Sequence, residues 1–190
     1  MTRNKTETKP KMFVALGASI TYGYPFEPED SWVERVRLES GWKVINAGIP
    51  GDTFRDLNLR LAKDVLDHDP DIVCLMAGTN DVNQGLSQPV IQQEVRNLLL
   101  QLQQKNIEVI IGLPLPVKTS REKSLSILRE WLREFGESQN LPVIDFHKDF
   151  IDEAGRIRSE LLIDGCHPRR EGYAIMGQRA VITLKEKGII

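Results

Sequence analysis

The sequence predicts an α/β fold, a three-layer α/β/α sandwich with a mostly parallel sheet of five strands between two layers of helices. Short apolar runs, each of a length typical of a buried strand, alternate along the chain with longer amphipathic stretches. This alternation is typical of right-handed βαβ units, which build a parallel sheet covered on both faces. No Pro- or Gly-rich linker divides the 190 residues, so we expect residues 11–190 to form a single domain.

The strand candidates are short runs in which apolar and β-branched residues dominate. They are Met12–Gly17, Lys43–Asn46, Ile72–Ala77, Glu108–Leu113 and Val143–Asp145. The helix candidates between them are amphipathic stretches, several with apolar residues at helical spacing. They are Ser31–Ser40, Phe54–Asp67, Pro89–Lys105, Arg121–Gln139 and Arg170–Lys187. Asn106 and Gly188 stand just beyond two of these helices, where C-terminal signals are expected.

The composition is that of an ordinary globular chain, with 41% apolar and 27% charged residues. A formal net charge of −2 argues against a nucleic-acid partner and against a polybasic membrane patch. The first apolar run, Met12–Leu16, is too short for a signal peptide, and no transmembrane stretch is visible. We therefore expect a cytoplasmic protein without stable membrane anchoring. Residues 1–10 are polar and are expected to be a disordered lead-in.

Unusual residues gather directly after the predicted strands. In an open parallel sheet, ligands bind beyond the carboxyl ends of the strands. The segments that follow the five strands are 18–21 (ASIT), 47–53 (AGIPGDT), 78–81 (GTND), 114–116 (PLP) and, after a connecting stretch, 164–168 (DGCHP). They contain a serine, a glycine-rich turn, an asparagine and an acid–base pair. Topology alone predicts that these groups converge on one edge of the sheet.

Ser19, His167 and Asp164 can fill the three roles of a serine nucleophile, its base and an orienting acid. The hydroxyl must lose its proton, the base must be held in the right tautomer, and donors must stand ready for the oxyanion. Ser19 stands at a strand-to-helix corner, and Asp164 and His167 are three positions apart in a glycine-containing turn. The donor candidates are the Asn80 side-chain amide and the Gly51 backbone N–H.

Each of these residues also has a structural interpretation. A serine at such a corner is a preferred helix cap. Asp164 and His167 could form an Asx-turn with a solvent-exposed histidine, and spacing alone does not decide between the two interpretations. The turn at Gly51 is expected to need positive φ, and Asn80 could cap a helix or a turn.

Other histidines and one cysteine compete for these roles. Asp145 and His147 form a rival acid–base pair, because side chains two residues apart in an extended segment point the same way. His68 stands at a helix end and is interpreted as structural. Cys166 lies beside His167, and we interpret it as a small packed neighbour rather than a nucleophile.

Taken jointly, these segments resemble the SGNH hydrolases, the GDSL-type esterases and lipases, over nearly the whole chain. The family's G-D-S-[ILS] block is G-A-S-I at 17–20 here, and its N-x-G-x-x-G block stands at 46–51. Its G-x-N-D and D-x-x-H-P blocks stand intact at 78–81 and 164–168. Ala18 departs from the pattern, since the family has an aspartate there that helps to hold the nucleophile loop.

The resemblance implies a flavodoxin-like sheet, with Ser19 as nucleophile, His167 as base and Asp164 as the acid that orients it. It also implies an oxyanion hole from the backbone N–H groups of Ser19 and Gly51 and the side chain of Asn80. No metal or organic cofactor is implied. We therefore expect a carboxylic ester hydrolase that acts on a small-molecule ester through an acyl-enzyme, with short-acyl esters such as acetylated sugars as the first expectation.

Three alternatives stay open at this point. The substrate could be a lysophospholipid or an acyl thioester, as for other members of the family that the chain resembles. The absence of a carboxylate at Ala18 also leaves room for a catalytically weak binding module. The architecture alone permits a nucleotide or flavin binder, but the sequence has no G-x-G-x-x-G or G-x-x-x-x-G-K-[ST] motif.

Overall fold

A computed structural model describes residues 11–190, so the lead-in predicted for residues 1–10 lies outside the described residues. Five strands form one sheet in the order β2-β1-β3-β4-β5, and every pair of neighbours is parallel. This strand order is the flavodoxin-like one, in which the sheet grows in both directions from the first strand. The predicted fold class is confirmed.

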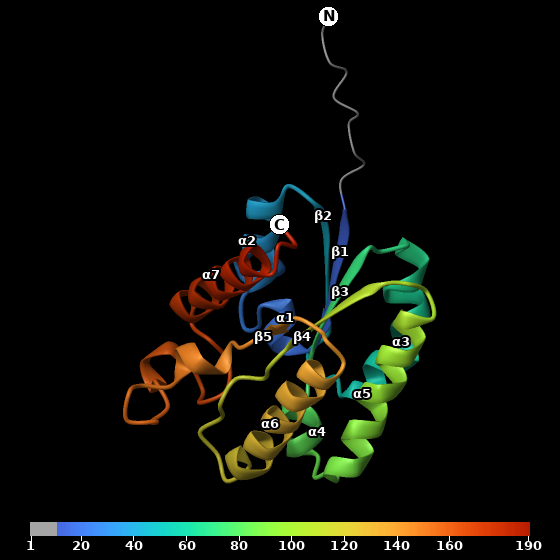
Figure 1. Ribbon diagram of the computed structural model, residues 1–190. Helices are drawn as coiled ribbons and strands as arrows, with labels where there is room; N and C mark the ends of the chain where they lie inside the picture. Colours follow the sequence, from blue (N-terminus) through green and yellow to red (C-terminus); the bar gives the residue numbers. More distant parts are fainter. Residues whose placement is uncertain (1–10) are drawn as a thin grey trace, which may run out of the picture.

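The elements alternate along the chain as the sequence predicts (Figure 1). The strands are β1 (Met12–Gly17), β2 (Lys43–Gly48), β3 (Ile72–Met76), β4 (Glu108–Gly112) and β5 (Val143–Ile144). The helices are α1 (Ser19–Tyr22), α2 (Trp32–Ser40), α3 (Phe54–Asp64), α4 (Thr79–Asn83), α5 (Gln88–Gln103), α6 (Glu122–Ser138) and α7 (Arg170–Glu186). Short 3-10 helices span Pro28–Asp30, Leu66–His68, His147–Phe150 and Ser159–Leu161.

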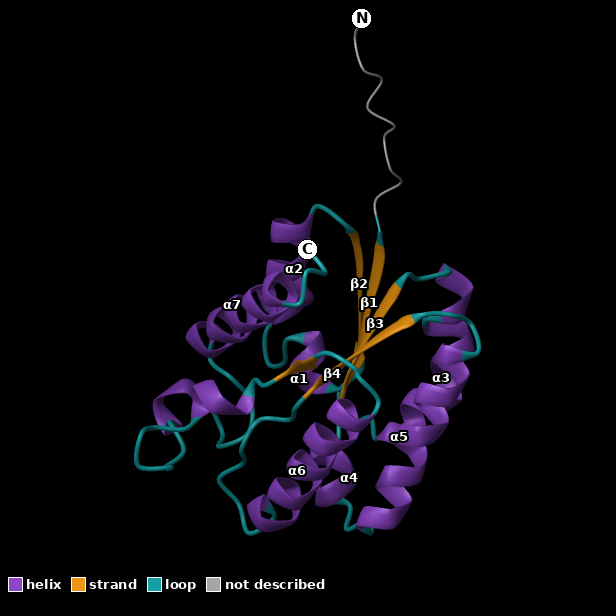
Figure 2. Ribbon diagram, in the orientation of Figure 1, coloured by secondary structure: helices purple, strands orange, loops and turns teal. Residues whose placement is uncertain are grey.

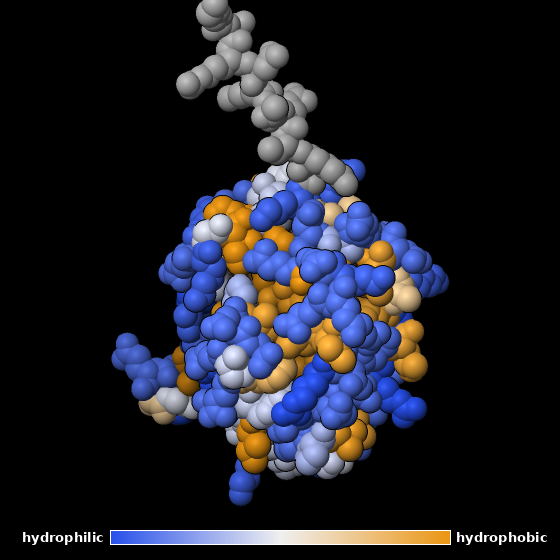
Figure 3. Space-filling model, turned by 45° about the vertical axis from the view of Figure 1, so that its right-hand side comes forward, coloured by the Kyte–Doolittle hydropathy of each residue, from blue (hydrophilic) through white to orange (hydrophobic). Residues whose placement is uncertain are grey.

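The sheet is the middle of three layers (Figure 2). Successive side chains of a strand point to opposite faces. In β1, Val14 and Leu16 therefore enter the core under α3, α5 and α6, whereas Phe13 and Ala15 enter the core under α2 and α7. Polar and charged residues cover much of the outer surface in the view of Figure 3, with apolar side chains showing between them.

Some boundaries differ from the predictions for local reasons. Strand β2 runs on to Gly48, because its last residues pair with the end of β1. Helix α3 ends at Asp64 and is followed by the 3-10 helix Leu66–His68. Val65, the C-cap of α3, has a φ of −130° and a ψ of −63°, outside the helical range, and Asp69, with a φ of +50°, ends the 3-10 helix. Helices α1 and α4 were not predicted, because they are too short to show helical periodicity.

The carboxyl ends of the central strands lie level with one another. Gly17 at the end of β1 is in register with Gly48 of β2 and Met76 of β3. A Cβ at Gly17 would lie 2.5 Å from the backbone oxygen of Met76, so glycine permits this close approach. Helices α1 and α4 begin just after β1 and β3, at the same edge. Within residues 11–190, no helix is both long enough and apolar enough to cross a membrane.

Candidate active site

Ser19 is the first residue of α1, directly beyond the end of β1. Its side chain is largely buried, and the cap position before it, Ala18, offers no side-chain hydrogen bond. The interpretation of Ser19 as a helix cap therefore does not hold, because Ala18 occupies the cap. As the first helical residue, Ser19 has a backbone N–H without a partner inside the helix.

Three side chains from the two ends of the chain meet in one line of hydrogen bonds. Ser19 Oγ lies 3.0 Å from His167 Nε2, and His167 Nδ1 lies 2.7 Å from Asp164 Oδ2. The turn that carries Asp164 and His167 is held by hydrogen bonds within it, because Asp164 Oδ1 accepts from the backbone N–H groups of Cys166 and His167. The Asx-turn and the acid–base pair are thus the same structure.

The surroundings of Asp164 keep its carboxylate ionised. Burial acts to raise the pKa of Asp164, but hydrogen bonds from the backbone and ring of His167 outweigh it, and the pKa is lowered. A carboxylate on Nδ1 holds the proton on that nitrogen, which leaves Nε2 free to accept a proton from Ser19. The arrangement can therefore activate a hydroxyl.

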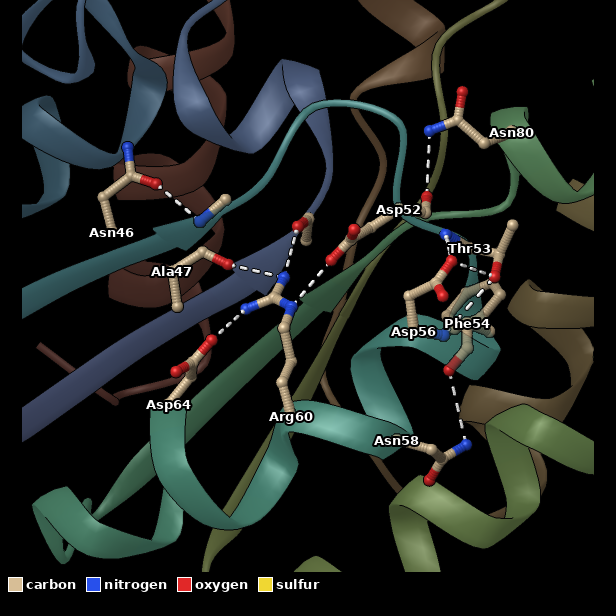
Figure 4. Close-up of polar contacts among 12 residues, drawn as sticks. Asn46, Ala47, Asp52, Thr53, Phe54, Asp56, Asn58, Arg60, Asp64 and Asn80 are labelled. Carbon is tan, nitrogen blue, oxygen red and sulfur yellow. Dashed lines mark hydrogen bonds and ion pairs between the residues drawn. The ribbon is translucent and has the colours of Figure 1, made fainter.

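Asn80 and Gly51 are joined through Asp52. Asn80 Nδ2 in α4 donates to the backbone oxygen of Asp52 at 2.9 Å, and its second hydrogen can serve another acceptor (Figure 4). Gly51 precedes Asp52 in an exposed loop and has a φ of +95°, as predicted for this turn. Asn80 lines the pocket described below, whereas Gly51 lies outside its lining.

A pocket of about 160 Å³ opens beside Ser19 and His167. It is bounded by residues that follow β1, β3 and β4 and by the turn that carries the acid–base pair. Its apolar lining consists of Ala18, Ile20, Met76, Ala77 and Pro114, and its polar lining includes Thr79, Asn80 and Asn83. The segments after β1, β3 and β4 and the turn at 164–168 therefore converge as strand topology predicts, whereas the predicted segment 47–53 is not part of the pocket lining.

The competing residues lie elsewhere or are inactive. Asp145 accepts hydrogen bonds from Arg133 and from the backbone N–H of Lys148. Burial, followed by the charge of Arg129, lowers the pKa of His147, which lines a different cavity. Cys166 lines the pocket beside Ser19, but burial and then the Asp164 charge raise its pKa to about 11. The thiol is therefore protonated near neutral pH.

Sequence reasoning assigned no role to three residues around the site. Arg60 of α3 donates a hydrogen bond to the end of β1, next to the site. The sequence feature that could have identified it is a charged residue beside Leu57 and Leu61, which are buried on the apolar face of the helix. The Tyr24 ring packs edge-on against the His167 ring, with 4.8 Å between the centroids. Buried Asp81 accepts the backbone N–H of Phe54, the first residue of α3. Tyr24 gave no sequence signal, whereas Asp81 is the last residue of the G-x-N-D block but was not assigned a place in the structure.

Among residues 11–190, no group of three or more His, Cys, Asp or Glu side chains is placed to hold a metal ion.

Comparisons with known proteins agree with this geometry. A model of the GDSL-like lipase/acylhydrolase family matches residues 15–175. The Escherichia coli K12 protein named thioesterase 1/protease 1/lysophospholipase L1 is 27% identical over 162 residues, which cover 82% of this chain and 74% of that protein. The acetylxylan esterase of Geobacillus stearothermophilus is 24% identical over 161 residues, which cover 77% of this chain and 74% of that protein.

Solved structures share the whole architecture. A G-D-S-L family protein from Desulfitobacterium hafniense has a TM-score of 0.86 and 30% identity, covering 92% of this chain and 99% of that one. A lipase/acylhydrolase from Enterococcus faecalis has a TM-score of 0.81 at 28% identity, covering 93% of this chain and 96% of that one. The chain belongs to the GDSL-like lipase/acylhydrolase family and is a carboxylic ester hydrolase.

Proposed function

We propose that this hydrolase cleaves short-acyl esters, with acetylated sugars as the leading class, through an acyl-enzyme on Ser19. In the first step His167 Nε2 takes the Ser19 proton while Oγ bonds to the acyl carbon. The tetrahedral intermediate then collapses, and Nε2–H protonates the alcohol oxygen as the ester bond breaks. A water molecule, deprotonated by His167 Nε2, then attacks the acyl carbon. Nε2–H returns the proton to Ser19 Oγ as the acyl–oxygen bond breaks and the acid leaves. The 3.0 Å separation of Ser19 Oγ and His167 Nε2 carries this proposal.

The proposed oxyanion hole uses three donors. Ser19 supplies a backbone N–H at the start of α1, Asn80 supplies its second amide hydrogen from the pocket wall, and Gly51 supplies a backbone N–H. Donors that are already in place stabilise developing charge without reorganisation, and one such donor is worth about 10²–10³ in kcat. The hydrogen bond between Asn80 and Asp52 supports this role by fixing the amide.

The size of the pocket supports a short acyl group. Its volume is about 160 Å³. Pockets that enclose drug-sized ligands are larger, at about 300–1,000 Å³. We therefore expect the pocket to hold an acetyl or butyryl group and a long acyl chain to extend out of it.

The alcohol side of the ester is expected next to Tyr24. The leaving oxygen must approach His167 Nε2, and the Tyr24 ring packs on that imidazole with 44% of the residue exposed. An exposed ring there offers an apolar face to a ring-shaped alcohol such as a sugar or a phenol. We expect Tyr24→Ala to raise KM for sugar and phenyl acetates more than for ethyl acetate, while Tyr24→Phe keeps the wild-type preference. An equal loss on all three acetates would instead assign Tyr24 to support of His167.

A second candidate is a lysophospholipase or acyl thioesterase. Three of the exposed large apolar residues, Tyr24, Ile49 and Ile163, come from loops at the site. Their backbone N–H groups donate to Ser19, Gly17 and His167, which anchors each loop beside the reacting groups. Exposed apolar side chains on these loops suit an acyl chain that continues outside the pocket.

The deciding experiment is a panel of p-nitrophenyl esters from acetyl to dodecanoyl, measured with the wild type and Ser19→Ala. We expect kcat/KM to fall beyond butyryl and Ser19→Ala to lose about 10⁶ in kcat. A maximum at long chains would replace the proposed substrate with the second candidate. Equal rates for wild type and Ser19→Ala would sink the nucleophile assignment.

Labelling separates an enzyme from a catalytically weak binding module. A fluorophosphonate probe is expected to add to Ser19 of the wild type and to leave Ser19→Ala unmodified, as read by intact mass and peptide mapping. Ligand binding without labelling would favour the binding module.

A further inference from the structure

The nucleophile loop has no side-chain support at its own cap. Ala18 is the cap residue of α1, and no side-chain hydrogen bond holds it. The strand end beneath it must nevertheless be held, because Ser19 contributes both its hydroxyl and its backbone N–H to the proposed reaction. A displacement of about 1 Å at such a site can cost roughly 10² in rate.

Arg60 holds this strand end from α3 (Figure 4). Its Nη2 donates to the backbone oxygens of Gly17 and Ala47, both at 2.9 Å, which joins the end of β1 to that of β2. Its Nε donates to Asp52 Oδ2 at 2.6 Å, and its Nη1 to Asp64 Oδ2 at 3.0 Å. One guanidinium therefore serves four acceptors, which lie in β1, in β2, in the loop between β2 and α3, and in α3 itself.

The residues that Arg60 binds are connected to each of the proposed oxyanion donors. Gly17 lies two residues before Ser19, and Asp52 directly follows Gly51. The backbone oxygen of the same Asp52 accepts the Asn80 amide at 2.9 Å. The position of Asp52 thus fixes both the glycine loop and the asparagine side chain.

We infer that Arg60 is a positioning residue that sets the relative places of the three oxyanion donors by clamping the ends of β1 and β2 to Asp52. The inference rests on the proposed function. Arg60 itself touches no reacting atom, and its side chain is only 13% exposed beneath the loops. Its effect on the reaction passes through Gly17 and Asp52.

The chemistry of the site explains why an arginine is needed. A guanidinium presents five N–H donors in a rigid plane, whereas a lysine ammonium has three donors on one point and cannot span the same acceptors. Burial raises the pKa of Asp52, and the hydrogen bond and charge of Arg60 oppose that rise. Asp56 and Asp64 also face this group and act in the same direction as burial. Without Arg60, a partly buried carboxylate would lose its partner, and the loop would be free to move.

The test compares Arg60→Ala and Arg60→Lys with the wild type on p-nitrophenyl acetate. We expect Arg60→Ala to lower kcat by about 10²-fold with little change in KM, because the donors act on the transition state rather than on bound ester. The second-order rate of fluorophosphonate labelling should fall in parallel, since the phosphonyl oxygen occupies the same place. Arg60→Lys should recover only part of both rates.

Two further variants make the result interpretable. Asp52→Ala keeps the backbone oxygen that Asn80 uses but removes the anchor of the clamp, so it should reproduce the loss in kcat even if Arg60→Ala does not fold. Arg179→Ala is the matched control. Arg179 forms a two-point ion pair with Asp149 that is about as buried as the pair of Arg60 and Asp52, and it lies outside the pocket lining. Arg179→Ala should therefore lower Tm about as much as Arg60→Ala does but leave kcat unchanged.

The outcomes separate this inference from the proposed function. If Arg60→Ala and Asp52→Ala keep the wild-type kcat and labelling rate, or if Arg179→Ala loses as much kcat as they do, the positioning role is overturned. In that case the proposed function is still supported, provided that Ser19→Ala abolishes wild-type hydrolysis. If Ser19→Ala hydrolyses esters as fast as the wild type, the proposed function itself has failed.

Discussion

Asp164 binds His167 through both of its carboxylate oxygens. Oδ2 lies 2.7 Å from ring Nδ1, and Oδ1 accepts the backbone N–H at 2.8 Å. One side chain therefore fixes both the orientation of the imidazole and the backbone that carries it. The two tasks can be separated by substitution, because an asparagine oxygen can keep the backbone bond but cannot supply a charge.

Asp164→Asn should retain the fold and lose most of the activity. An amide at this position cannot hold the imidazole in the required tautomer or stabilise the imidazolium, and a comparable change costs about 10⁴ in kcat. Asp152→Asn is the control, because Asp152 accepts backbone N–H groups in a similar turn outside the pocket lining. Steady-state kcat and Tm check both variants. A wild-type kcat in Asp164→Asn would remove Asp164 from the mechanism.

Gly51→Ala should impair catalysis through backbone conformation rather than through a clash. A Cβ at Gly51 would meet no heavy atom within 4 Å, but the φ of +95° costs an alanine about 1–3 kcal/mol. The loop should relax and turn the Gly51 N–H away, so kcat should fall with KM little changed. Gly155→Ala has the same open surroundings at a φ of +74° and should lose stability but no kcat. Equal kcat values in the two variants would contradict the oxyanion role.

Cys166→Ser should keep its ester hydrolysis. The Cys166 pKa of about 11 leaves the thiol protonated at neutral pH, so it should not compete with Ser19, the proposed nucleophile. The variant should also still be labelled at Ser19 by a fluorophosphonate. If Cys166→Ser instead lost as much kcat as Ser19→Ala, Cys166 would have to be placed in the reaction.

Asp81→Asn should change how stability depends on pH. Burial raises the pKa of Asp81 to about 6, and the charges of Asp56 and Glu94 add to that rise. The folded state therefore favours protonated Asp81, and this contribution is present below pH 3.8 and lost as the pH rises towards about 6.

The Asp81→Asn variant cannot titrate at this position and should escape that loss. Its unfolding free energy relative to the wild type should therefore increase between about pH 4 and pH 7, by up to roughly 3 kcal/mol. Urea unfolding at several pH values measures how this difference in unfolding free energy changes with pH. A pH-independent effect of the amide on stability does not alter that change. A flat difference across this range would show that Asp81 titrates normally.

Local patterns were enough to predict the strands and the longer helices. Apolar runs and helical spacing predicted all five strands and the five longer helices, because burial on a sheet or on a helix face leaves a periodic trace in the sequence. The short helices α1 and α4 leave no such trace, and they were missed. The end of β2 was also missed, because the pairing of Gly48 with Gly17 is a contact between distant residues.

The sequence by itself determined the fold class, the edge of the sheet where functional residues gather, and the turn from Asp164 to His167. Each of these depends on neighbours within a few residues or on the general geometry of parallel sheets. Only the tertiary structure decided that Ser19 Oγ meets His167 Nε2 across 148 positions of sequence and that Arg60 joins Gly17 to Asp52. The direction in which such side chains point depends on how whole helices pack against the sheet, and no local pattern encodes that packing.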